Sequence, residues 1–67
     1  KPQHVVLKGK KLTWADNSQV LLWAVCQNGK VIGFTTKPQF TVKNTKATYA
    51  VRAANAMGGL GDPVTAE

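Results

Sequence analysis

Apolar and polar residues alternate in several short runs along this chain, and no stretch repeats its apolar residues at the spacing of an amphipathic helix. The runs are rich in Val, Thr and aromatic residues, which fit a pleated, half-buried surface. Turn-forming residues separate the runs at about the 8-to-12-residue spacing of small β-sandwiches. The pattern predicts an all-β fold of about six or seven strands, at residues 4–7, 10–15, 20–26, 30–35, 39–43, 47–55 and 63–66.

The third run, residues 20–26, is apolar on both faces. This is typical of a central strand that is covered on both sides, so its second face, which carries Leu22, Ala24 and Cys26, is expected to pack against something. Alternation along the other runs gives one inward face for each. The predicted core consists of Leu12, Trp14, Leu21, Trp23, Val25, Ile32, Phe40, Val42, Tyr49, Val51 and Ala53.

Asn28-Gly29 is the strongest local turn signal. A two-residue type I′ turn needs positive φ at both central positions, and Asn and Gly tolerate this best. We therefore predict that the runs on either side of it form a β-hairpin.

Three segments resemble parts of fibronectin type III domains. Residues 49–55 (YAVRAAN) resemble the penultimate strand of that family, residues 12–14 (LTW) its second strand, and residues 23–30 (WAVCQNGK) its central hairpin. The resemblance implies a two-sheet antiparallel sandwich, immunoglobulin-like, in which Tyr49 is the corner tyrosine with its hydroxyl bonded to backbone near residues 44–45. The chain departs from the family in its length, which is below the usual roughly 90 to 100 residues, and in Cys26, which stands where an aromatic is common.

Residues 52–61 (RAANAMGGLG) resemble the short modules appended to secreted polysaccharide-degrading enzymes of gut Bacteroidetes, including pectin esterases and lyases. This resemblance implies one domain, 1–67, excised from a larger multidomain protein and located outside the cell or in the periplasm. The expected function is a non-catalytic spacer or docking module of such an enzyme, for example a pectinesterase, with neighbouring domains of the parent chain as partners. The candidate interaction surface is Leu22, Ala24, Phe34 and Arg52.

Two alternative functions follow from the aromatic residues and the charge. A module that binds acidic polysaccharide needs exposed, roughly coplanar rings, yet Trp14 and Trp23 fall on inward faces, leaving Phe34 as the exposed aromatic. A cell-surface protein-interaction module would use the net charge of +6, which attracts polyanions. The basic residues are spread along the chain rather than clustered, so we expect no nucleic-acid partner.

Chemically reactive residues are few and far apart. The chain has one Ser (Ser18) and one His (His4), and its three acidic residues are in predicted turns or at the end of the sequence. Cys26 lies in an apolar strand, where cysteine behaves as a small hydrophobic residue. We therefore expect no catalytic, cofactor or metal site. A single cysteine permits no internal disulfide, no apolar run is long enough to span a membrane, and the isolated domain is expected to be a monomer.

Overall fold

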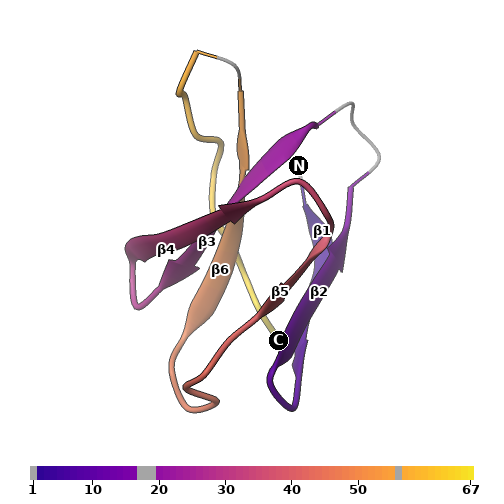
Figure 1. Cartoon of the computed structure of the whole chain (residues 1–67), viewed down its shortest axis with the longest axis vertical. Helices are drawn as coiled ribbons and strands as arrows, with labels where there is room; N and C mark the ends of the chain where they lie inside the picture. The colour runs from indigo at the N-terminus through magenta and orange to yellow at the C-terminus, as the bar shows by residue number, and fades with distance from the viewer. Residues whose placement is uncertain (1, 17–19, 56) are drawn as a thin grey trace.

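The computed structural model describes residues 2–16, 20–55 and 57–67. These residues form seven β-strands in two antiparallel sheets, which confirms the predicted small all-β sandwich (Figure 1). The strands are β1 (Gln3–Lys8), β2 (Lys11–Ala15), β3 (Leu22–Gln27), β4 (Lys30–Thr35), β5 (Gln39–Thr41), β6 (Tyr49–Ala54) and β7 (Val64–Thr65).

One sheet has three strands in the order β1-β2-β5, and the other has four in the order β4-β3-β6-β7. The predicted hairpin joins β3 to β4 through Asn28 and Gly29, whose φ angles of 51° and 86° are both positive, as a type I′ turn requires. The register of this pair shifts by one residue between Val25 and Cys26. This shift is a β-bulge, and it leaves Ile32 without a partner on β3.

The core fills the space between the two sheets and is built from alternate residues of the strands. Its buried members are Val5, Leu12, Trp14, Trp23, Val25, Val42, Tyr49 and Val51. Phe40 and Ala53 are partly buried and pack against this cluster, so the sequence-based core is confirmed at all but two positions. Sequence reasoning had not assigned Val5, which is buried in β1.

Leu21 and Ile32 were wrongly predicted as core residues, because their side chains are 83 % and 44 % exposed. Leu21 precedes β3, which begins at Leu22, so the in-and-out alternation of the strand does not extend to it. Ile32 lies at the bulge, where the extra residue breaks the alternation of β4.

The two tryptophans meet edge to face in the core, with ring centroids 5.9 Å apart and an interplanar angle of 72°. The Nε1–H of Trp23 donates to Oδ2 of Asp16 at 3.1 Å, so this carboxylate anchors the ring at the end of β2. Nε1 of Trp14 is buried and has no hydrogen-bond partner among the described residues. Of the two rings, only Trp23 therefore has its N–H group hydrogen-bonded within the described residues.

The two long sides of the sandwich differ in how the gap between the sheets is closed. On one side the last residues of the chain close the gap between the sheets, because Ala66 N–H donates to Tyr49 O and Glu67 N–H donates to Val5 O, at 2.8 and 2.9 Å. On the other side lie β4 and β5, the outer strands of their sheets, with Gly33 of β4 against the ring of Phe40.

Replacing Gly33 with alanine is expected to destabilise the fold by about 1 kcal/mol, the low end of the range for overpacking. A Cβ at this position would lie 2.9 Å from Cζ and 3.1 Å from Cε1 of Phe40, which is too close, so the half-buried ring must move. Urea unfolding of the variant measures the loss, and the same Gly33→Ala substitution should cost less in a Phe40→Leu background, measured against Phe40→Leu alone.

Gly61→Ala is the matched control for this prediction. The nearest atom to a Cβ at Gly61 is 3.6 Å away, an ordinary contact, so alanine fits and reduces the freedom of the unfolded chain. We expect this variant to be neutral or more stable by up to about 0.5 kcal/mol. Equal effects of the two substitutions would show that Phe40 does not constrain Gly33.

Candidate functional site

The outer face of the four-stranded sheet is the side that points away from the three-stranded sheet. Trp23 and Val25 of β3 belong to the core, so the alternate residues of this central strand point outward. These residues are Leu22, Ala24 and Cys26, and their cross-strand neighbours are Val31 and Phe34 on β4 and Ala50, Arg52 and Ala54 on β6.

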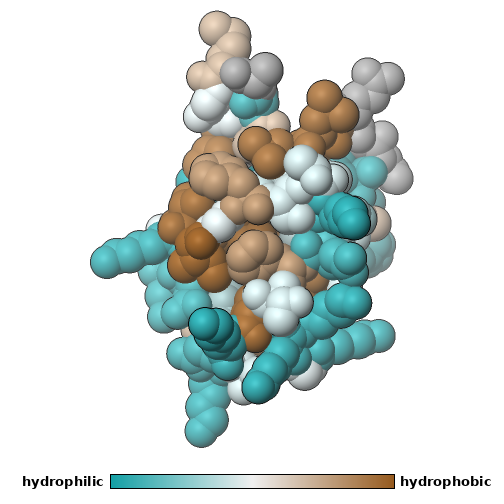
Figure 2. Space-filling view, in the orientation of Figure 1, coloured by the Kyte–Doolittle hydropathy of each residue, from teal (hydrophilic) through white to brown (hydrophobic). Residues whose placement is uncertain are grey.

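Two small residues of the central strand, Ala24 and Cys26, lie beside larger side chains of the flanking strands. Ala24 lies between Phe34 and Arg52, and Cys26 lies between Val31 and Ala50. Neither sheet of the described residues covers this side, yet Ala24 and Cys26 are only 0 % and 4 % exposed, because the larger side chains around them shield them, while Phe34 and Val31 remain 56 % and 41 % exposed. Figure 2 shows apolar surface gathered over β4 and its neighbours, with polar side chains around it.

The four residues predicted as an interaction surface all belong to this outer face, but they contribute differently. Phe34 is exposed, and Leu22 and Arg52 are half-buried. Arg52 is held in place because its Nε–H donates to Gly61 O at 2.6 Å. Ala24 was wrongly included in the predicted interaction surface, because it is fully buried and shapes the face without offering surface to a partner.

The aromatic residues offer no platform of exposed rings. Trp14, Trp23 and Tyr49 are buried in the core, as the sequence pattern predicted, and Phe40 is half-buried against it. Phe34 is the exposed aromatic residue among those that the structure describes. One ring can stack on one sugar, but it cannot form the coplanar row that binds a polymer chain.

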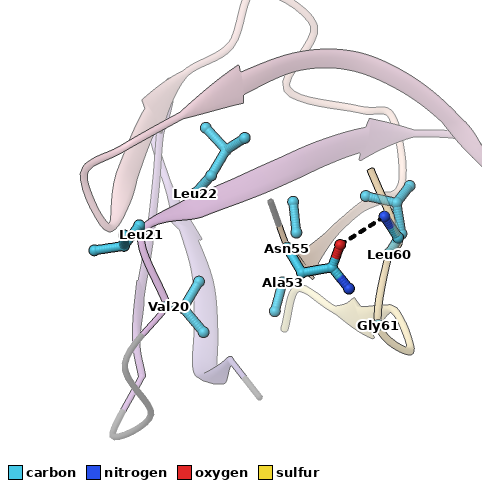
Figure 3. Close-up of a pocket in the computed structure, with 9 residues that line it drawn as sticks. Val20, Leu21, Leu22, Ala53, Asn55, Leu60 and Gly61 are labelled. Carbon is cyan, nitrogen blue, oxygen red and sulfur yellow. Dashed lines mark hydrogen bonds between the residues drawn. The ribbon is translucent and has the colours of Figure 1, made fainter. Parts of the chain in front are cut away.

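A cavity of about 560 Å³ opens at one end of the sandwich, and nothing in the sequence pattern indicated it. Figure 3 shows Val20, Leu21 and Leu22 on one side of it and the segment that follows β6 on the other. The lining residues are mostly apolar: Val20, Leu21, Leu22, Ala53, Ala54, Asn55, Gly59, Leu60 and Gly61.

Asn55 shapes the glycine-rich turn beside this cavity. Its Oδ1 accepts the N–H of Gly59 at 2.8 Å (Figure 3) and the N–H of Met57 at 2.9 Å, and Gly61 N–H donates to Ala53 O at 2.8 Å. These bonds give the glycine-rich turn a defined shape. The available signal was an Asn followed by a glycine-rich stretch, since Asn side chains bond the backbone two residues ahead.

Among the described residues, the structure does not bring the reactive side chains together. No group of three or more His, Cys, Asp or Glu residues that could hold a metal ion occurs in residues 2–16, 20–55 and 57–67. Cys26 is a free, buried thiol, His4 is exposed, and Ser18 lies outside the described residues. No helix among the described residues is long and apolar enough to cross a membrane.

Tyr49 has the contact that the family resemblance implied. Its ring is buried, and its hydroxyl donates to the carbonyl oxygen of Asn44 at 2.6 Å, five residues upstream. The contact fixes the loop before β6 and is structural.

In comparisons with known proteins, no family model, no curated protein and no solved structure matches this chain.

Proposed function

We propose that this chain is a non-catalytic docking module that packs the outer face of its four-stranded sheet against a neighbouring domain of a secreted polysaccharide-degrading enzyme, of the pectinesterase or lyase type. The observation that carries the docking role is the apolar outer face, on which Phe34 and Val31 stand exposed beside buried Ala24 and Cys26. The kind of parent enzyme, and its place outside the cell or in the periplasm, are supported by the resemblance of residues 52–61.

The chemistry of the outer face suits contact with another domain. Its central strand contributes Leu22, Ala24 and Cys26, so no charged side chain has to be desolvated there. Fully burying an exposed Phe or Val side chain contributes roughly 1.5 to 3 kcal/mol, and about half of this remains available at Phe34 and Val31, which are 56 % and 41 % exposed. Two such residues with Leu22 can therefore provide the apolar part of an interdomain contact, and Arg52 can provide a polar margin.

The variant Phe34→Ser tests this docking role. In the isolated chain it should lower the free energy of unfolding by only about 1 kcal/mol, because the ring is 56 % exposed and its buried part only shields Ala24. In a longer chain that includes the adjacent domain, it should remove a large part of the extra stability that the adjacent domain provides. Thermal and urea unfolding of both lengths measure the two effects.

Met57→Ser is the control, since Met57 is almost fully exposed in the turn after β6 and lies outside the outer face. We expect this substitution to leave the free energy of unfolding unchanged at both chain lengths. A domain that unfolds independently of its neighbour, with the same stability at both lengths, would contradict docking and leave only a spacer.

Phe34 and Arg52 flank Ala24, and this favours one alternative, the binding of an acidic sugar polymer. An aromatic ring and a guanidinium on one face can contact a sugar ring and its carboxylate. An amide NMR titration at physiological salt, with pectin fragments and separately with a neutral glucan, separates the two functions. Docking predicts no localised shifts with either, whereas shifts for pectin alone around these residues would favour the alternative.

A further inference from the structure

Strand β4 has an open edge. It is the last strand of the four-stranded sheet and pairs with β3 on one side only, so half of its backbone groups point away from the sheet. The other outer strands have less free backbone edge for pairing. Val5 of β1 already accepts the N–H of Glu67, and β5 and β7 are three and two residues long.

The register shows which backbone groups of β4 face the open edge. Gly61 N–H donates to Ala53 O, so the backbone of Ala53 points away from β3. Its partner Trp23 must then direct its own N–H and C=O toward β4, where it pairs with Thr35. Alternation along β4 turns the N–H and C=O of Phe34 outward, to the open edge.

The side chains along this edge are apolar in the middle and basic at both ends. Val31, Ile32 and Phe34 are all exposed, which is unusual for three large apolar residues of one strand. Lys30 begins β4, and Lys37 follows it in a turn in which the Oγ1 of Thr35 bonds both the N–H and the C=O of Lys37 at 3.1 Å.

Charge decides which kind of strand fits. A second copy of this chain, itself at +6, would bring Lys30 of one copy beside the Lys37 end of the other in an antiparallel pair, and Lys30 beside Lys30 in a parallel pair. None of the three acidic residues is in β4 or in the turns at its ends. The edge therefore disfavours its own copy and matches a segment with acidic ends.

We propose that β4 binds an extended segment of a partner protein, apolar in the middle and acidic at both ends, which adds to the sheet as a fifth strand. Backbone hydrogen bonds to Phe34 provide the pairing, and Lys30 and Lys37 select the charge of the partner. The bulge at Ile32 keeps the added strand short, because it interrupts regular pairing along the edge. This inference is independent of the docking of the outer face.

The test uses three acetylated and amidated peptides and an amide NMR titration at physiological salt. The first peptide is Glu-Thr-Val-Thr-Val-Thr-Glu, the second carries Lys at both ends, and the third is the first with its central amides N-methylated. We expect the first to shift the amides of residues 31–36, with a Kd on the order of 0.1 to 1 mM, and to slow amide exchange at Phe34. The second and third should bind at least about tenfold more weakly.

A charge reversal, Lys30→Glu with Lys37→Glu, provides the matched variant. Both residues are exposed, so the fold should be kept, and the preference should invert toward the Lys-ended peptide. Equal binding of the N-methylated peptide, shifts spread over the lysines of the whole chain, or no shifts at millimolar peptide would each overturn the proposal. Shifts of residues 31–36 that depend on protein concentration without any peptide would make a second copy the occupant, and would overturn it too.

Discussion

Replacing Trp23 with alanine should leave the isolated chain largely unfolded. The ring is buried on the inner face of β3, meets Trp14 edge to face, and donates its Nε1–H to Asp16, so alanine removes packing, an aromatic pair and a hydrogen bond together. Large-to-small substitutions of this kind cost roughly 3 to 5 kcal/mol. In a chain of 67 residues the hydrophobic core rarely supplies a net stability above roughly 3 to 5 kcal/mol, so most or all of it would be lost.

The loss is measured by far-UV circular dichroism and by the dispersion of the amide NMR spectrum, with Leu21→Ala as the control. Leu21 is two residues upstream and is also a large apolar residue, but it is 83 % exposed, so its truncation should change stability by no more than about 0.5 kcal/mol. A folded Trp23→Ala variant, or equal losses at the two positions, would show that the inward face of β3 has been placed wrongly.

Alternation predicts the core wherever a strand is regular, and it fails where the strand starts late or contains an extra residue. Trp23 and Val25 were correctly placed inside because β3 is regular over Leu22–Gln27. Leu21 fits the same alternation but precedes the strand, and Ile32 lies at the bulge. A bulge arises from the fit of two paired strands, so the sequence of one run does not reveal it.

The outer face was predictable in part. A central strand that is apolar on both sides indicated Leu22, Ala24 and Cys26, and the structure places all three on the face away from the core. Whether Ala24 is accessible depends on its neighbours across the sheet, Phe34 and Arg52, and therefore on the register. The cavity at the end of the sandwich also needs three-dimensional information, because it forms between two segments that are far apart in the sequence.

Phe34 contributes to both proposals through different atoms. Its side chain belongs to the outer face, where docking of a domain would cover it, whereas its backbone groups face the open edge of β4. A strand added at the edge extends the sheet sideways and leaves the outer face free. The two contacts are therefore compatible in geometry, and Phe34→Ser should weaken docking while keeping the backbone pairing with the acidic peptide.

Replacing Tyr49 with phenylalanine should destabilise the fold by about 1 to 2 kcal/mol, although only one oxygen is removed. The hydroxyl has a single proton, and of the two oxygens near it, Asn44 O at 2.6 Å and Gln27 Oε1 at 3.2 Å, the nearer one receives that proton. Without the hydroxyl, the Asn44 carbonyl loses its partner at the edge of the core. Because Asn44 itself is exposed, water can replace part of the bond, which keeps the cost in the lower part of the range for a lost buried partner.

Asn44→Ala is the matched comparison, because Tyr49 bonds the backbone of Asn44 and not its side chain. That variant keeps the tyrosine contact and removes only the bond from Lys46 N–H to Asn44 Oδ1 at 2.9 Å, for which we expect a loss of no more than about 1 kcal/mol. Urea midpoints give both losses, and amide exchange at residues 44–48 should accelerate more in Tyr49→Phe. If the phenylalanine variant instead matches the parent chain in midpoint and exchange, the hydroxyl does not hold the loop before β6, and the buried ring alone accounts for the role of Tyr49.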